Sequence, residues 1–197
     1  MDADLLIPKL DRPASQPEPL GAVLRRTRKT QAMSLTSLSD AAAVSAASLS
    51  RIENGRMSPT FEVVVRICDA LGLTITGLMS GRDVAQGGLL TGVVRTLQTA
   101  QYHYEVLGHT DGAAPFVTLR TRILCQSLAS FGEMHSHRGF EQIVVQSGCI
   151  AVHLGSRRPH LLEEGESIAF DSTTPHAVVA PHGAASVLWI YAPGGQR

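Results

Sequence analysis

The sequence predicts an α+β protein with two domains, a bundle of five short helices followed by an all-β domain. From residue 20 to residue 79 the apolar side chains recur at helical spacing, whereas beyond "GRDVAQGG" (residues 81–88) they alternate with a period of two. The chain has 197 residues, 44% of them hydrophobic, which is enough for two small cores. The expected divisions are a disordered, proline-rich tail (1–19), a helical domain (20–82), a linker (83–88) and a β domain (89–197).

Four of the five expected helices have a residue that can cap the helix N-terminus directly ahead of them, since Ser and Thr accept hydrogen bonds from the first free backbone amides. These caps are Ser34, Ser45, Thr60 and Thr74. The apolar faces of the five helices are Leu20, Val23, Leu24 and Thr27; Leu35, Leu38, Ala41 and Ala42; Leu49 and Ile52; Val64, Ile67 and Leu71; and Ile75, Leu78 and Met79.

The second half of the chain contains short alternating segments separated by turn residues, which is typical of a sandwich or a barrel. The expected strands are "FVTLRTRIL" (116–124), "FEQIVVQ" (140–146), "CIAVHLG" (149–155), "ESIAFD" (166–171), "HAVVA" (176–180) and "SVLWIYA" (186–192). A further aromatic strand, "QYHYEVL" (101–107), is expected ahead of them.

Composition and charge exclude several classes of protein. No apolar run is long enough for a membrane span, and the acidic, proline-rich start does not resemble a signal peptide, so a cytoplasmic protein without a membrane partner is expected. Three scattered cysteines do not form a disulfide framework. Residues 20–82 hold eight basic and four acidic side chains, a net charge of +4, between segments that are each −2. A basic segment of this kind fits a nucleic-acid partner.

Residues 20–79 contain "VSAASLSRIENGRMSPT" (44–60), and this segment resembles the Cro/repressor-type (XRE) helix-turn-helix family of transcriptional regulators. The resemblance implies a double-stranded DNA operator as partner. It also implies a homodimer, because two half-sites one helical turn apart supply affinity that one reading helix lacks. A further implication is that Arg28 and Glu53 form an ion pair that ties the third helix to the first.

In the resembling family the helix after Ser45 enters the major groove, and helical spacing places one set of its side chains opposite the buried Leu49 and Ile52. Arg51 has the bidentate geometry that suits guanine, while Asn54 and Arg56 are expected to hold phosphates. The candidate DNA-binding residues are Ser45, Ala46, Ala47, Ser48, Arg51, Asn54 and Arg56.

Two later segments, "HSHRGFEQIVVQSG" (135–148) and "GESIAFDSTTPHAVVA" (165–180), resemble the two signature motifs of the cupin superfamily, whose fold is a small jelly-roll barrel. The resemblance implies four metal ligands: His135, His137, Glu141 and His176. Three residues depart from the usual second motif, although none of them is a ligand: Asp171, Thr173 and Ala180.

Strand geometry supports these ligands, since residues of the same parity face one side of a strand. Three imidazoles and a carboxylate suit a divalent transition metal, either zinc, iron, manganese or nickel. Tyr102 and Tyr104 alternate with His103 and could line an effector pocket at the mouth of the barrel, or simply pack in the core.

Two functions remain open, together with a third possibility in which the cupin half is a metal-free effector pocket and the His/Glu set is residual. The first is a transcriptional regulator, without enzymatic activity, whose cupin domain senses a metal, a small-molecule effector or both. The alternative resembles the hydroxypropylphosphonate epoxidases, non-haem iron enzymes with the same domain order, whose iron ligands match His137, Glu141 and His176. The lysine that the helical domain of those enzymes sends to their site falls at Ala32 in this chain, and the DNA-reading pattern is retained. These two observations favour the regulator.

Overall fold

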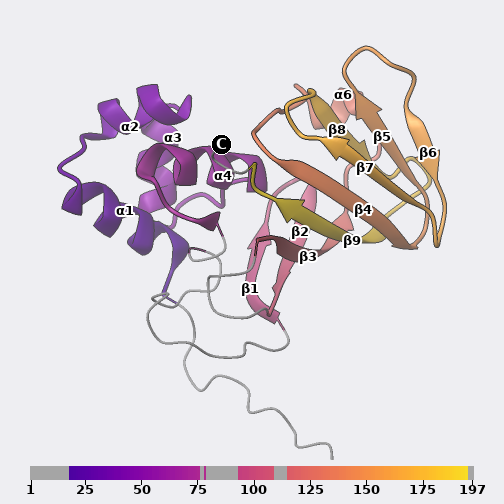
Figure 1. Ribbon diagram of the computed structural model, residues 1–197, viewed down its shortest axis with the longest axis horizontal. Coiled ribbons are helices and arrows are strands. Elements are labelled where there is room, and N and C mark those ends of the chain that lie inside the picture. The colour runs from indigo at the N-terminus through magenta and orange to yellow at the C-terminus, as the bar shows by residue number, and fades with distance from the viewer. Residues whose placement is uncertain (1–17, 76–77, 79–92, 109–114, 195–197) are drawn as a thin grey trace, which may run out of the picture.

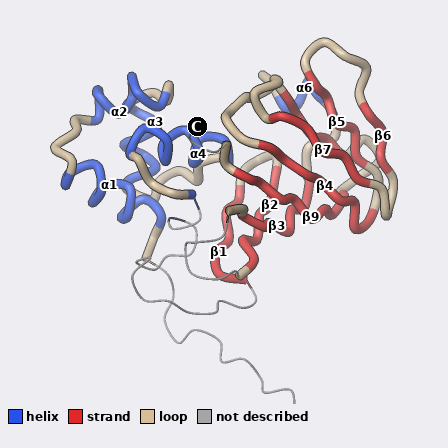
Figure 2. Tube along the Cα trace, viewed as in Figure 1, coloured by secondary structure: helices blue, strands red, loops and turns tan. Residues whose placement is uncertain are grey.

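The structure is a computed structural model that describes residues 18–75, 78, 93–108 and 115–194. The N-terminal helices gather at one end of the molecule, and the strands lie at the other end together with the short helix α6 (Leu128–Phe131). Helix α4 (Phe61–Leu71) stands between the two groups (Figure 1; helices are blue and strands red in Figure 2). The predicted linker (83–88) and all but the last two residues of the predicted tail (1–19) lie outside the described residues. The helical and β halves therefore occur in the predicted order.

The helical half contains α1 (Leu20–Thr30), α2 (Leu35–Ala42), α3 (Ala46–Glu53) and α4 (Phe61–Leu71). Three predicted caps are confirmed, because the side chains of Ser34, Ser45 and Thr60 accept hydrogen bonds from backbone amides in the first turns of α2, α3 and α4. In the predicted fifth helix, Ile75 and Leu78 are helical and buried, whereas Met79 lies outside the described residues.

A buried ion pair joins α1 to the end of α3. Arg28 donates from Nε and Nη2 to the two carboxylate oxygens of Glu53, at 2.6 and 2.8 Å, and from Nη1 to the carbonyl oxygen of Met33 at 2.8 Å. The predicted partnership of Arg28 and Glu53 is confirmed. The two helices also approach closely at Gly21, where an added Cβ would lie 2.2 Å from the carbonyl oxygen of Ile52.

The β half consists of two antiparallel sheets. Its elements are β1 (Val93–Gln98), β2 (Tyr102–Leu107), β3 (Val117–Ile123), α6 (Leu128–Phe131), β4 (Phe140–Ser147), β5 (Ile150–Leu154), β6 (His160–Leu162), β7 (Ser167–Asp171), β8 (His176–Val179) and β9 (Ala185–Ala192). The larger sheet has the order β1-β2-β3-β9-β4-β7 and the smaller one β6-β5-β8. Buried and half-buried residues alternate along β9, so one face of the larger sheet forms the core.

All the expected strands are present, but the sequence analysis missed β1, β6 and the short helix α6. Strand β6 has only three residues, two of them exposed, and therefore carries no alternation to detect. Closure of the two sheets into a barrel stays a prediction.

Helix α4 contacts the β half as well as the helical core. Seven of its eleven residues are buried: Phe61, Glu62, Val64, Val65, Ile67, Cys68 and Leu71. The ring centroid of Phe61 lies 6.2 Å from that of Tyr104 in β2 and 5.3 Å from that of Tyr191 in β9. A second contact joins the halves where Arg95 of β1 donates to the carbonyl oxygen of Glu18, at 3.1 Å. None of the described helices is long and apolar enough to cross a membrane.

The buried ion pair gives a first prediction. Replacing Arg28 by Met should lower the free energy of unfolding by about 3–5 kcal/mol, because Glu53 would keep a charge in a buried position without its partner. Chemical denaturation of the full chain measures this loss.

Replacing both members of the pair, as Arg28→Met with Glu53→Leu, should cost less than the single change. The matched control is Arg120→Met. Arg120 pairs with Glu105 at 2.8 Å, but its side chain is 52% exposed, so the loss should stay below about 1 kcal/mol. Equal losses for the buried and the exposed arginine would contradict this account.

Candidate metal centre and DNA-reading helix

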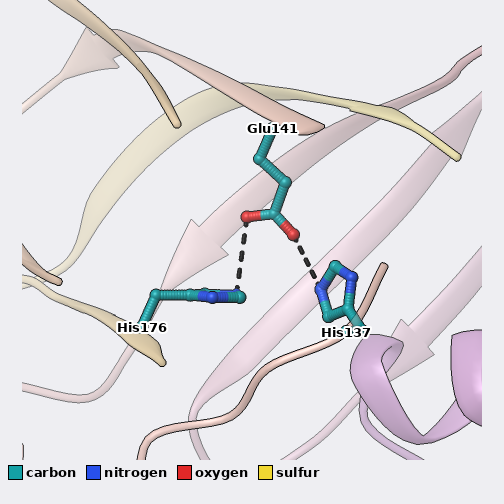
Figure 3. A group of neighbouring side chains, drawn as sticks. All are labelled: His137, Glu141 and His176. Atoms are coloured by element: carbon teal, nitrogen blue, oxygen red, sulfur yellow. Dashed lines mark ion pairs between the residues drawn. The ribbon is translucent and has the colours of Figure 1, made fainter. Parts of the chain in front are cut away.

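Three buried side chains of the β half converge on one point (Figure 3). One potential ligand atom from each of His137, Glu141 and His176 lies within 4.8 Å of the others. His137 Nε2 is 2.9 Å from one oxygen of Glu141, and His176 Nε2 is 3.6 Å from the other. All three residues are at least nine-tenths buried. A carboxylate is thus enclosed between two imidazoles and away from bulk water.

The local fold presents these ligands. Glu141 lies on the buried side of β4, and His176 begins β8. His137 lies in the segment before β4, which is held in place because its backbone amide donates to Ser172 at 3.0 Å. That segment turns at Gly139, whose φ of +116° disfavours other residues and whose added Cβ would lie 2.5 Å from the Ala192 carbonyl oxygen. Only glycine fits this close approach.

Each histidine has its hydrogen fixed on the nitrogen that points away from Glu141. His137 Nδ1 lies 3.1 Å from the Arg138 carbonyl oxygen, and His176 Nδ1 lies 2.9 Å from the Thr174 carbonyl oxygen. A carbonyl only accepts, so each Nδ1 carries the hydrogen and each Nε2 offers a lone pair. Both Nε2 atoms are buried without a hydrogen-bond partner, as is Oε2 of Glu141. Three converging lone pairs of this kind fit a divalent metal.

The charge of the site favours a cation. Burial lowers the pKa of His137, but the adjacent Glu141 carboxylate raises it, and the pKa ends above its usual value. The Glu141 carboxylate thus favours a positive charge beside it, and a divalent cation would compensate that carboxylate.

His135, the fourth expected ligand, lies outside the group of three. Its backbone exchanges hydrogen bonds with that of His176, at 3.1 and 2.8 Å. Its ring is half-buried and packs on Phe131, with centroids 5.5 Å apart. The parity rule holds only within a strand, and β4 begins five residues later, at Phe140.

Tyr102 and Tyr104 are buried, but they differ in their hydrogen bonding. The hydroxyl of Tyr102 donates to the carbonyl oxygen of Val178 at 2.7 Å and accepts from the Val178 amide at 3.2 Å, so it supports the contact between the two sheets. The hydroxyl of Tyr104 is buried, and a polar group that acts on it is the backbone of Phe61 in α4, which lowers its pKa against the larger effect of burial. The two tyrosines therefore face different neighbours, Tyr102 the smaller sheet and Tyr104 helix α4.

The predicted DNA-reading residues lie on and around α3. Ser45 caps the helix and Leu49 and Ile52 are buried, as expected. On the other side, the solvent-exposed residues are Ser45, Ala47, Arg51, Asn54 and Arg56, while Ala46 and Ser48 are half-buried. Asn54 accepts a hydrogen bond from Arg25 of α1 at 3.2 Å, which places a second basic side chain beside it.

Comparison with known families supports both halves of the chain. A family model for a helix-turn-helix domain matches residues 19–80, and a family model for a cupin domain matches residues 128–191. The chain carries a helix-turn-helix domain followed by a cupin domain. The resemblances deduced from "VSAASLSRIENGRMSPT" and "HSHRGFEQIVVQSG" are thereby confirmed.

Two similar proteins have names that refer to transcription. The transcriptional regulator ClgR of Mycobacterium tuberculosis is 44% identical over 59 residues, which are 30% of this chain and 53% of that protein. The chain thus spans about half the length of the curated relatives it matches. The crystal structure of an HTH_3 family transcriptional regulator from Vibrio cholerae is similar over 91% of this chain and 96% of its own, with a TM-score of 0.64 and 21% identity. At this identity the likeness shows the fold alone.

The prediction that the chain has no enzymatic activity is corrected by a third comparison. Hydroxypropylphosphonic acid epoxidase from S. wedmorenis, in complex with fosfomycin, matches 90% of this chain and 99% of its own, with a TM-score of 0.48 and 21% identity. An enzyme therefore stands among the similar structures, and the exclusion of catalysis no longer holds. The likeness does not transfer the activity of that enzyme to this chain.

One residue near the site was missed by the sequence analysis. Glu62, on α4 of the helix-turn-helix domain, is 5% exposed, and its charge acts on His137, Tyr102 and Tyr104. The available signal was the run "FEVVVRICDAL" (61–71), which is too apolar for a helix with one buried face. An acidic residue inside such a run is expected to be buried, and a buried acid is a candidate functional residue.

Metal analysis of the untagged protein checks the centre. His137→Ala and His176→Ala should each reduce a stoichiometric metal content nearly to zero, because two ligands do not hold a divalent ion against buffer. The matched control is His135→Ala, which should keep its metal. Loss of metal in the control would restore His135 as a ligand and show that the three-residue group is incomplete.

Proposed function

We propose that this protein is a DNA-binding transcriptional regulator whose cupin domain holds a divalent transition metal and responds to that metal or to a small-molecule effector. The observation that carries the proposal is the exposed face of α3, where Ala47, Arg51 and Asn54 stand beside the exposed Arg56. A polar, basic helix face over a buried apolar one is the geometry with which helix-turn-helix proteins enter the major groove.

Helix α3 has few side chains that can reach a base. Arg51 is the one long side chain among the proposed base-contacting residues, and two of its guanidinium nitrogens can donate together to guanine. Arg56 and the neighbouring Arg25 would hold phosphates, which fix position without reading sequence. We therefore propose a homodimer that binds two half-sites, because a single short reading helix supplies little affinity.

In the cupin domain, His137, Glu141 and His176 would hold the metal. We include in the proposal the closure of the two sheets into a small jelly-roll barrel around it. Zinc, iron, manganese and nickel all fit two imidazoles and a carboxylate. The metal would supply a fixed positive charge and open coordination positions at which an effector could bind.

A second candidate function is metal-dependent oxidation. The specific observation is the number of ligands, since three residues converge where four were expected. Two histidines and one carboxylate leave part of the coordination sphere open, as in non-haem iron oxygenases. His135, the fourth expected ligand, would have filled a further coordination position, but it lies outside this group of three.

DNA binding gives a test of the reading helix. Arg51→Ala should lower the affinity for the operator by about 1–3 kcal/mol and relax the preference at one base position. Arg56→Ala should weaken all sequences about equally and reduce the salt dependence of binding. Fluorescence anisotropy with the operator and with scrambled DNA measures both effects. An Arg51→Ala variant with unchanged sequence preference would show that Arg51 does not read a base.

Metal removal separates the two candidate functions. For a regulator, a chelator should change the affinity of the full chain for its operator, and restoring the metal should reverse the change. His176→Ala should be insensitive to the chelator. For an oxidation catalyst, operator affinity should not respond to the metal, and metal-dependent oxygen consumption should appear with a small organic acid as substrate.

A further inference from the structure

The carboxylate of Glu62 occupies an unfavourable position for an acid. The residue is 5% exposed, and its Oε2 is buried without a hydrogen-bond partner. It belongs to the first turn of α4, where the helix dipole favours a negative charge. That effect is small compared with the cost of burying a carboxylate oxygen that has no hydrogen-bond partner among the described residues. Some other positive group should compensate the charge.

The surroundings of Glu62 locate that group. The preceding residue, Phe61, packs edge-on against Tyr191, and the ring of Tyr191 packs against that of His137, with centroids 5.3 Å apart in both contacts. A helix in the violet colours of the N-terminal half passes beside His137 in Figure 3. Burial raises the pKa of the Tyr102 and Tyr104 hydroxyls in β2, and the charge of Glu62 adds to both shifts. Glu62 therefore belongs to the end of α4 that packs against the β half, next to the ring contacts that lead through Tyr191 to His137.

A balance of charges indicates that the positive group opposite Glu62 is the metal cation. With both histidines neutral, a divalent cation bound by Glu141 keeps one positive charge inside a buried site. Such a charge is as unfavourable there as the unpartnered carboxylate of Glu62. Together, the cation and the two carboxylates sum to zero. Each of the two buried charges thus supplies what the other lacks.

We propose that Glu62 is a member of the metal centre contributed by the DNA-binding domain. It does not bind the ion directly, but it balances its charge and so holds α4 against the cupin domain when the metal is present. This inference rests on the proposed metal site and deepens the proposed function, because it names the residue through which metal occupancy reaches the helix-turn-helix domain. Because the metal supplies the balancing positive charge, the packing of α4 against the cupin domain is more favourable with the metal bound than without it.

The test uses the full chain, Glu62→Gln, and Co²⁺ as the probe ion. Calorimetric titration should show Co²⁺ affinity reduced about 10- to 100-fold, as for the loss of other groups that support a metal from outside its ligand set. Hydrogen exchange should show that Co²⁺ slows exchange of the α4 amides in the unsubstituted protein and not in the variant. The matched control is Asp69→Asn, which makes the same charge change on an exposed residue of the same helix and should leave both readouts unchanged.

Stability of the metal-free proteins distinguishes this role from a structural one. Glu62→Gln removes an uncompensated charge, so the metal-free variant should unfold at a higher temperature than the metal-free unsubstituted protein. A variant that is less stable, or that binds Co²⁺ as tightly as Asp69→Asn, would overturn the inference and leave the metal site intact. Failure of the unsubstituted protein to bind Co²⁺ would overturn both the inference and the proposed metal centre.

Discussion

The packing of Phe61 links the helix-turn-helix domain to the cupin domain, and the positions of α4 and the proposed metal ligands depend on it. This ring begins α4, belongs to the core of the helix-turn-helix domain, and contacts Tyr104 and Tyr191 of the cupin domain. Because one side chain is shared by two cores, neither domain can repack α4 without disturbing the other. Helix α4 also packs on α2, so the contact with the cupin domain continues into the helix-turn-helix bundle. Direct packing of this kind can transmit a change from one domain to the other.

The proposed metal centre depends on the same packing through Tyr191. Tyr191 pairs across the sheet with Glu141, donates its hydroxyl to the carbonyl oxygen of Arg138, and lies against the ring of His137. It thereby fixes two of the three proposed ligands and touches Phe61 as well. Burial raises the pKa of Tyr191 above the physiological range, so the hydroxyl stays protonated and remains a donor. The ligand geometry is thus set by neutral hydrogen bonds and ring contacts, which salt does not screen.

Sequence alone predicted the parts of the structure that depend on local spacing. Helix caps such as Ser45 and Thr60 were predictable because a cap acts within three residues. Glu141 was predictable because it lies inside a strand, where alternation decides which side chains are buried. The same rule does not apply to His135, which precedes the strand, so its role as a ligand stays a prediction. Glu62 could not be found in this way. Periodicity indicates that a residue is buried, but it does not indicate that the residue is buried against another domain.

The order of strands in the larger sheet has a consequence for biosynthesis. Strand β9 lies between β3 and β4, so residues 185–192 must enter the middle of a sheet whose other strands have already been translated. The local contacts of α1 to α4 can form as soon as they leave the ribosome, whereas the pairing of β9 closes long loops and is intrinsically slow. A nascent chain therefore passes through an interval in which α1 to α4 have left the ribosome and Glu141 still lacks Tyr191, its cross-strand partner. If the proposed function holds, the ability to bind DNA arises during synthesis before the ability to respond to a metal.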